Sequence, residues 1–379
     1  MLSYRKLAMR VLGRPLHTGG GGIDLPRPAS QRAAALILTA AMLTTLAAPA
    51  FAETWYIENG DITVKASGTE GKNTVSQGNK KDVEDTNTII TNQKTDKASS
   101  NTVTIEANGK NDKVEVTLKD VNIDTSSRKK AAVSVTGEGD TNIKLNGDNA
   151  LKSDIYRSGI YGSGSLTISG GENDSLTAQG GSGANGISSS GNLTISGGTV
   201  TATGDDGGHG IYSRGGVTIS GGSTVTAKGE SGTISGGDGI CSSGGVTISG
   251  GSTVTANGGN GGSIGGGSGI YSNGSVTISG GSTVTANGGN STNSSGGYGI
   301  SSLDVAISGG TVTANGGDSK DGYGGDGIHS NGVTISGGTV NTTGGNGTNS
   351  NGGEGIYGRK GIDLSGSLEL TAKAGSPNG

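Results

Sequence analysis

The chain has 379 residues, of which 80 are glycine and 3% are aromatic, and its formal net charge is −4. The glycines have no three-residue period, which excludes collagen, and they separate β-branched runs, which favours turns over disorder. The acidic balance argues against nucleic acid or an anionic membrane surface as a partner.

Residues 1–52 differ in composition from the rest and predict a secretory signal peptide. Basic residues precede an uncharged apolar run, 33–48, and Ala50-Phe51-Ala52 then supplies small residues for a cleavage site. The run is too short and too rich in alanine and threonine to favour a membrane anchor. We therefore expect a secreted or cell-surface protein, with no membrane insertion after the leader is removed. The mature chain would hold 21 basic and 30 acidic residues, a net charge of −9.

Residues 53–158 are more charged and less regular than residues 159–379. Short β-branched runs predict strands near 62–64, 88–90, 103–105, 114–118, 121–123, 133–135 and 143–145. The polar stretch 65–86 predicts a loop or a capping excursion. A solenoid needs an atypical end to block further stacking, so we assign this segment to an N-terminal cap plus irregular coils. Trp55 and Tyr56 are the candidates to seal the core.

Residues 159–379 carry a repeat. Gly-Ile recurs at Gly159, Gly186, Gly210, Gly239, Gly269, Gly299, Gly327 and Gly355, at spacings of 24 to 30 residues. A Thr-Ile-Ser-Gly-Gly run and then a Thr-Val-Thr-Ala run come after it at near-fixed offsets, and only the next segment varies in length. Three short strands cannot bury an apolar side alone, so copies must stack. We predict an all-β fold, a right-handed parallel β-helix of about 8 regular ~28-residue coils plus irregular N-terminal coils, continuous over 53–379.

Period-two alternation assigns each side chain to the core or to the surface. In 210–229 it places Ile211, Val217, Ile219, Val225 and Ala227 on the inside. Asn257, Asn287 and Asn315 follow the third run at equal offsets. They predict either a stacked amide ladder or three residues that tolerate a left-handed turn, and the turn interpretation is sufficient.

The order of motifs in 113–170 resembles a known family. Lys113–Asp124 (KVEVTLKDVNID) is followed by Ala131-Ala132-Val133-Ser134-Val135, by Asn142–Gly147 (NIKLNG), and by Ser158-Gly159-Ile160-Tyr161 leading into Leu166–Gly170 (LTISG). This order is similar to that of bacterial exported carbohydrate-binding parallel β-helix proteins. The resemblance implies a cell-surface protein that binds acidic, polygalacturonate-like plant polysaccharide with calcium.

The position after each Gly-Ile forms the first candidate site. Stacking would align Tyr161, Ser188, Tyr212, Cys241, Tyr271, Ser301, His329 and Tyr357 in one outward column. Sugar rings stack on tyrosine, so the candidate carbohydrate-binding residues are Tyr161, Tyr212, Tyr271, His329 and Tyr357. The partner would be pectin-like polysaccharide or cellulose. The plain alternative is that tyrosine suits an exposed strand. We interpret Cys241 as an incidental outward residue and not as a reactive thiol, because no histidine is expected near it in the repeat register.

Acidic side chains in the variable loops form the second candidate site. Calcium takes six to eight oxygens, which neighbouring loops could pool with backbone carbonyls. The candidates are Asp205, Asp206, Asp238, Asp318, Asp321 and Asp326. No established calcium-loop spacing is present, so the alternative is solvated loop carboxylates. Calcium is the one cofactor that we expect.

Three other functions are compatible with parts of the sequence. A pectate-lyase-like enzyme needs a base and carboxylates converging on one strand face, whereas the regular strands carry threonine and serine, and His209 and His329 look isolated. We therefore expect no enzyme activity. The Thr-x-Thr runs suggest an ice-binding face, which long uneven loops would spoil. A structural, adhesin-like surface rod that binds protein is the main rival to polysaccharide binding.

Overall fold

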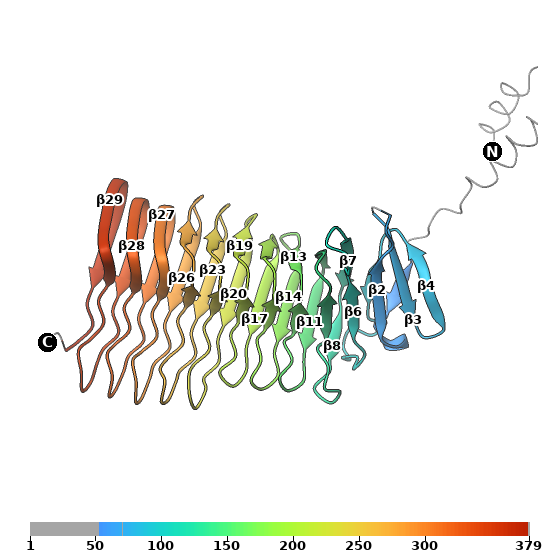
Figure 1. The fold of residues 1–379 in the computed structure, drawn as a ribbon, viewed down its shortest axis with the longest axis horizontal. Coiled ribbons are helices and arrows are strands. Elements are labelled where there is room, and N and C mark those ends of the chain that lie inside the picture. The colour runs from blue at the N-terminus through green and yellow to red at the C-terminus, as the bar shows by residue number, and fades with distance from the viewer. Residues whose placement is uncertain (1–52, 70, 378–379) are drawn as a thin grey trace, which may run out of the picture. The chain divides into compact units, whose positions relative to one another are not determined.

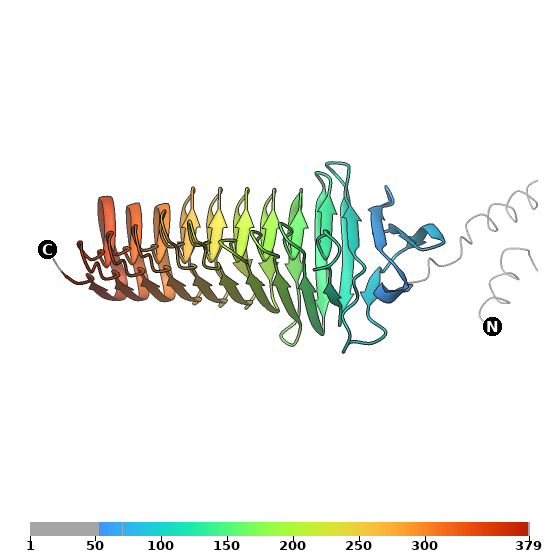
Figure 2. The same cartoon turned by 90° about the horizontal axis from the view of Figure 1, so that it is seen from below.

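The computed structural model describes residues 53–69 and 71–377, which form a parallel β-solenoid of about ten turns (Figure 1). Seen from below, the coils succeed one another along a single direction (Figure 2). The predicted signal peptide lies outside the described residues. Among the described residues, no helix is both long and apolar enough to cross a bilayer.

The first end of the solenoid is closed by an antiparallel excursion. β1 (Thr54–Tyr56), a 3₁₀ turn (Ile57–Asn59) and β2 (Ile62–Ala66) are followed by β3 (Asn73–Gln77) and β4 (Lys80–Asp85). β3 pairs antiparallel with both β2 and β4. The stretch 65–86 is thus the expected cap, but it is a strand meander and not a loop.

Trp55 seals the core beneath this cap, as predicted. It is 1% exposed, and its indole Nε1 donates a 2.8 Å hydrogen bond to Oδ2 of Asp85. The prediction for Tyr56 is wrong, because side chains alternate along β1 and Tyr56 therefore points outward, 37% exposed.

Three parallel ladders run along the solenoid. The first contains β2, β6 (Val103–Glu106), β9 (Val133–Thr136), β12 (Ile160–Gly162), β15 (Ile187–Ser189), β18 (Ile211–Ser213), β21 (Ile240–Ser242) and β24 (Ile270–Ser272). From β12 on, each of its strands begins at the isoleucine of a Gly-Ile pair. The second contains β1, β5 (Ile89–Thr91), β7 (Lys113–Lys119), β10 (Asp140–Asn146), β13 (Ser165–Ser169), β16 (Leu193–Ser196), β19 (Val217–Ser220), β22 (Val246–Ile248) and β25 (Val276–Ile278).

The third ladder corresponds to the Thr-Val-Thr-Ala runs. It contains β8 (Asn122–Asp124), β11 (Asp148–Lys152), β14 (Ser175–Gln179), β17 (Thr199–Thr203), β20 (Thr224–Lys228), β23 (Thr253–Asn257) and β26 (Thr283–Asn287). In the last coils one long strand spans all three ladders: β27 (Ile300–Asn315), β28 (Ile328–Thr343) and β29 (Ile356–Lys373). All seven strands expected in 53–158 are present.

The core is a thin aliphatic stack, as the alternation predicts. Ile211, Val217, Ile219, Val225 and Ala227 are each at most 1% exposed. Each lies over a like residue of the next coil, as Ile211 does over Ile240 and Val225 over Val254. Equivalent inward positions therefore repeat the same packing from coil to coil.

The Asn257, Asn287 and Asn315 side chains form an amide ladder, so the simple turn interpretation falls short. Nδ2 of Asn287 donates to Oδ1 of Asn257 at 2.8 Å, and Nδ2 of Asn315 donates to Oδ1 of Asn287 at 2.9 Å. The ladder ties three coils together at one edge.

The loops that close the later coils also stack, which the sequence did not predict. Two rows of glycines face each other, and we call them the glycine double row: Gly237, Gly267, Gly297, Gly325 and Gly353 on one side, and Gly259, Gly289, Gly317 and Gly345 on the other. Their peptide groups form a continuous chain, in which Gly267 N–H donates to Gly259 and Gly289 N–H donates to Gly267, at 2.9 and 2.8 Å. The variable loops are therefore part of the ordered solenoid.

Candidate functional site

The residues that come after each Gly-Ile form one column, as predicted. Strand pairing places Tyr161 beside Ser188, then continues through the remaining members in unbroken register: Ser188 with Tyr212, Tyr212 with Cys241, Cys241 with Tyr271, Tyr271 with Ser301, Ser301 with His329, and His329 with Tyr357. Tyr161 is 41% exposed and Tyr271 36% exposed. The column lies on the outer side of the strands, because the preceding isoleucine is buried in every coil except the last, where Ile356 is half-buried. Ser188 and Ser301 are each only 8% exposed, so the larger side chains form the accessible part of the column.

A second column lies beside the first and was missed in the sequence. It consists of the residues immediately before each Gly-Ile, which are Ser158, Asn185, His209, Asp238, Ser268, Tyr298, Asp326 and Glu354. In several coils the side chain accepts a hydrogen bond from the backbone N–H one coil further on. Oδ1 of Asn185 accepts from His209, and Oδ1 of Asp238 accepts from Ser268, at 2.9 and 2.7 Å. This bond links the side chain of one coil to the backbone of the next along the second column.

The two columns together make a surface that we call the outer strip. It holds five of the eight described tyrosines and both described histidines: Tyr161, His209, Tyr212, Tyr271, Tyr298, His329 and Tyr357. Aligning only the residues that come after each Gly-Ile pair could not reveal this cluster of aromatic side chains, because His209 and Tyr298 come before their Gly-Ile pairs.

In the last coils of the solenoid, the aromatic side chains of the outer strip stack on one another. The His329 ring lies 4.4 Å from that of Tyr298 and 4.7 Å from that of Tyr357, centroid to centroid, with interplanar angles of 22° and 14°. Nδ1 of His329 is 2.7 Å from Oδ2 of Asp326. Burial, together with the negative charge of Asp326, raises the pKa of Tyr298. His329 is therefore held in a rigid aromatic setting and is not isolated.

The middle of the outer strip holds a polar cluster. His209 stacks on Tyr212 with a centroid distance of 5.6 Å, and its Nδ1 lies 3.3 Å from Oδ2 of Asp238. Burial raises the pKa of Asp238, and burial together with the Asp238 carboxylate raises the pKa of the Cys241 thiol. The expectation that Cys241 has no histidine neighbour is wrong, because His209 reaches it from the previous coil.

The end of the outer strip that lies towards the N-terminal cap, which we call its near end, opens into a groove of about 600 Å³. Ser134, Tyr161 and Ser188 of the first ladder line it, and so does Tyr156. Three cationic side chains also line it: Lys129, Lys130 and Arg157. This groove combines exposed aromatic rings with positive charge in a chain that is acidic overall.

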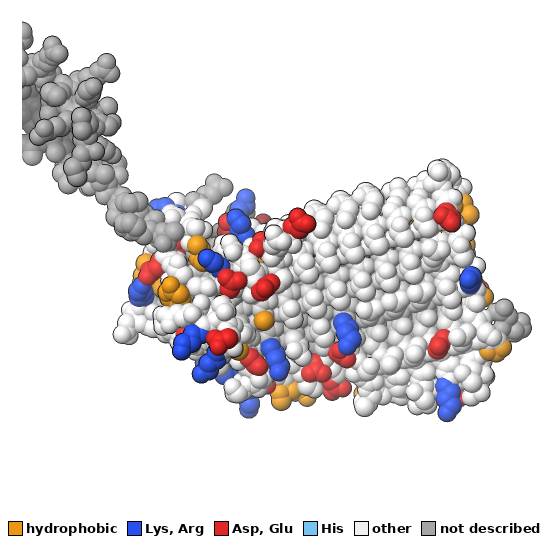
Figure 3. Space-filling view, turned by 180° about the vertical axis from the view of Figure 1, so that it is seen from behind, with side chains coloured by type: hydrophobic (Ala, Val, Ile, Leu, Met, Phe, Trp, Pro, Cys, Tyr) orange, Lys and Arg blue, Asp and Glu red, His pale blue; other side chains and the backbone are white. Residues whose placement is uncertain are grey.

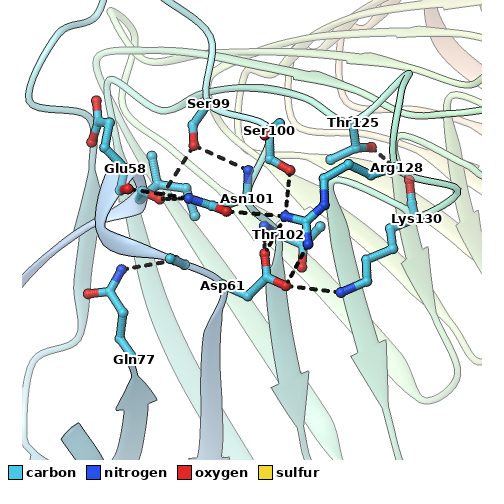
Figure 4. Close-up of polar contacts among 12 residues, drawn as sticks. Glu58, Asp61, Gln77, Ser99, Ser100, Asn101, Thr102, Thr125, Arg128 and Lys130 are labelled. Carbon is cyan, nitrogen blue, oxygen red and sulfur yellow. Dashed lines mark hydrogen bonds and ion pairs between the residues drawn. The ribbon is translucent and has the colours of Figure 1, made fainter. Parts of the chain in front are cut away.

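The cations around this groove differ in their pairing, and Figure 4 shows the two that pair with Asp61, Arg128 and Lys130. Oδ1 of Asp61 accepts from Nη1 of Arg128 at 2.8 Å, and Oδ2 accepts from Nζ of Lys130 at 2.9 Å. Burial alone would raise the pKa of Asp61, but hydrogen bonds, led by that from Lys130, lower it to about 2. Among the ion pairs of the described residues, none involves Lys129 or Arg157.

Charged side chains are unevenly distributed along the solenoid. In the face that Figure 3 presents, they gather over the first coils, while the later coils are largely uncharged. In the sequence, 15 of the 21 lysines and arginines after residue 52 lie within 53–158, together with 17 of the 30 acidic residues. The positive charge at the groove is therefore local and comes from Lys129 and Arg157, which line it without an ion pair among the described residues.

Two of the aspartates expected to bind calcium take part in loop hydrogen bonds. Oδ1 of Asp318 accepts from the backbone N–H of Asn346 at 2.6 Å. Oδ1 of Asp321 accepts from Nδ2 of Asn349 at 2.7 Å. These bonds link successive loops, in the way that Asn257 and Asn287 link successive strands.

The other four expected calcium ligands lie elsewhere. Asp205 and Asp206 lie together in the loop after β17, whereas Asp238 and Asp326 belong to the second column of the outer strip, three coils apart. The six carboxylates therefore occupy several separate places. Of the six, Asp238 alone belongs to a group of three potential metal ligands among the described residues. Calcium binding stays a prediction.

Comparison of the chain with protein-family models, with curated proteins and with solved structures finds no match. The fold defines the class, a β-solenoid of about ten turns with ~28-residue coils. Function must therefore be argued from the outer strip itself.

Proposed function

We propose that this chain is an exported, non-catalytic protein that holds an extended acidic polysaccharide along the outer strip. The observation that carries the proposal is the collection of tyrosine and histidine rings into two registered columns. Tyrosine combines an apolar ring with a polar hydroxyl, which suits it to stacking on a sugar while hydrogen bonding its hydroxyls.

The spacing of the columns supports an extended ligand over a compact one. Rungs of a parallel ladder are about 4.8 Å apart, so Tyr161, Tyr212 and Tyr271, on alternate rungs, stand about 10 Å from one another. From Tyr161 to Tyr357 the first column spans seven such steps, roughly 34 Å. Successive sugars of an extended polysaccharide could therefore contact successive rungs along the whole column.

The groove at the near end supports an acidic sugar. Lys129 and Arg157 line it and are exposed, without ion pairs among the described residues. An arginine binds a carboxylate with two parallel hydrogen bonds, and lysine supplies a point charge. Elsewhere the acidic chain would repel a polyanion, so this groove would select where a pectin-like chain begins to bind.

Secretion and the absence of catalysis are parts of the same proposal. The predicted leader supports export to the cell surface or the medium. Nδ1 of His209 already accepts the backbone N–H of Asp238 at 2.8 Å, which occupies the lone pair that a general base would need. Calcium would bridge polysaccharide carboxylates to loop oxygens.

The test is retention on insoluble polysaccharide. We expect the wild-type protein to be retained by pectin more than by cellulose. Replacing Tyr161 and Tyr271 together by alanine should remove most of this retention. Tyr323→Ala is the matched control, because Tyr323 is a 60% exposed loop tyrosine outside the outer strip. Full retention of the double variant, with native circular dichroism, would refute sugar binding by the outer strip.

Two further arms separate the parts of the proposal. Lys129→Gln with Arg157→Gln should weaken retention on pectin and leave retention on cellulose unchanged. Repeating the assay with a chelator of calcium tests the cofactor, since lost retention would support calcium and unchanged retention would remove it from the proposal.

The rival is a structural surface rod whose partner is a protein. The glycine double row favours it, because backbone packed on backbone stiffens the coils without presenting side chains. Adhesion to cells that survives the double tyrosine substitution would support the rod.

A further inference from the structure

His209, Asp238 and Cys241 bring three kinds of metal-binding side chain to one point of the outer strip. The three potential ligand atoms all lie within 4.8 Å of one another. His209 comes from the turn before β18, and Asp238 and Cys241 come from the next coil, before and within β21. Coil stacking therefore assembles the group from residues 29 and 3 positions apart.

The chemistry of the group points to a cation. Asp238 is a largely buried carboxylate, and no lysine or arginine pairs with it in the described part of the chain; its ionisable neighbour is the imidazole of His209. Thiolate, imidazole and carboxylate together are ligands of zinc, whereas calcium prefers oxygen alone. With the thiol deprotonated, the three ligands carry two negative charges, which one divalent ion neutralises.

An equivalent place elsewhere in the outer strip provides an internal comparison. Asp326 and His329 occupy the positions of Asp238 and Cys241, but Tyr298 stands where His209 stands in the earlier cluster. Asp326 there pairs directly with His329 at 2.7 Å. That cluster has two ligands of the zinc type, while the His209 cluster has three, a number typical of zinc sites that keep one position open.

We propose that His209, Asp238 and Cys241 bind one divalent transition-metal ion, for which Zn²⁺ is the best fit. Binding forms bonds from a ring nitrogen of His209, a carboxylate oxygen of Asp238 and Sγ of Cys241, and the thiol releases its proton to solvent. Water fills the fourth position. The site lies between Tyr212 and Tyr271 in the first column, and metal binding there does not require that the chain bind polysaccharide.

Metal binding should change one existing hydrogen bond. The backbone N–H of Asp238 donates to Nδ1 of His209 at 2.8 Å, so this nitrogen carries a lone pair and Nε2 carries the hydrogen. A metal bound at Nδ1 takes over that lone pair. The Asp238 amide should then exchange with solvent faster in the metal-loaded protein, whereas the Ser268 amide, which donates to Asp238 Oδ1, reports on whether the carboxylate stays in place.

The experiment is titration of the purified protein with Co²⁺, followed by displacement with Zn²⁺. We expect a thiolate-to-cobalt charge-transfer absorption at one equivalent, which Zn²⁺ removes. Cys241→Ser should abolish the band and weaken Zn²⁺ binding at least tenfold. His209→Asn should weaken Zn²⁺ binding to a similar extent.

These substitutions use residues that the same columns already accept. Serine occupies the Cys241 position at Ser188 and Ser301, and asparagine occupies the His209 position at Asn185, so the variants should fold, as circular dichroism would verify. Asp326→Asn is the matched control and should leave the band intact. No charge-transfer band in the wild type, or Zn²⁺ affinity unchanged by Cys241→Ser, would overturn the proposal.

Discussion

Replacing Gly289 by alanine tests the close packing of the glycine double row. A Cβ at this position would lie 1.9 Å from the carbonyl oxygen of Gly259 and 2.4 Å from its carbonyl carbon. Both are backbone atoms, so no side chain can rotate away. Gly289 is not among the glycines with positive φ, so the effect isolates steric contact from backbone strain.

The magnitude depends on the bonds that must break. Ordinary contact begins near 3.4 Å, so the two backbones must separate by about 1.5 Å. That movement disrupts two 2.8 Å hydrogen bonds, from Gly289 N–H to Gly267 and from Gly288 N–H to Asn315. A buried backbone group left unpaired costs about 1–3 kcal/mol, so losing two such bonds in Gly289→Ala should destabilise the fold by about 2–6 kcal/mol.

Gly162→Ala is the matched control. Its Cβ would meet nothing closer than 3.7 Å, and Gly162 pairs in register with Ser189, so the column already accepts a side chain. We expect no loss, or a gain of about 0.4–1 kcal/mol from the lower entropy of the unfolded chain. Denaturant unfolding and amide hydrogen exchange measure both variants. Equal stability of the two would refute the packing argument.

Three further changes test the ends and edges of the solenoid. Trp55→Ala should cost about 3–5 kcal/mol in denaturant unfolding, because the largest side chain of the cap leaves a cavity. Asp61→Asn should cost at most about 1 kcal/mol, since its carboxylate is partly exposed; the lowered pKa means that the difference from wild type is present above about pH 4 and lost toward pH 2. Asn287→Ala should remove two side-chain hydrogen bonds of the amide ladder, at about 0.5–1.5 kcal/mol each, and increase hydrogen exchange at that edge.

Each of these has a contradicting outcome. Unchanged protection of β1 and β5 in Trp55→Ala would mean that the cap does not seal the core. A pH-independent effect of Asp61→Asn would assign its role to packing and not to charge. Full stability of Asn287→Ala would show that the amide ladder does not stabilise this edge of the solenoid.

The coil and its inward face could be predicted from the sequence because their signal is local and repeated. Gly-Ile, Thr-Ile-Ser-Gly-Gly and Thr-Val-Thr-Ala recur at near-fixed offsets, and alternation then assigns Ile211 or Val225 to the core without knowledge of the neighbours. The first column of the outer strip could be predicted in the same way, since it requires only that equivalent positions of successive repeats lie over one another.

The features that the sequence did not show depend on contacts between unlike positions. His209 and Cys241 lie in different columns and different coils, so aligning the repeats on Gly-Ile alone kept them apart. Tyr298 was missed for the same reason. The glycine double row has no side chains to align, and its order arises from backbone bonds. The prediction for Tyr56 was wrong because neighbouring residues of a strand point to opposite faces, so Trp55 and Tyr56 cannot both enter the core.

The most direct test of the outer strip is how affinity depends on the length of the ligand. Calorimetric titration with oligogalacturonides of increasing length should show affinity rising until the ligand covers the roughly 34 Å between Tyr161 and Tyr357, with the rise reduced in the Tyr161 and Tyr271 double variant. An affinity that reaches its plateau with the shortest ligands, or that ignores the double substitution, would contradict an extended sugar-binding surface.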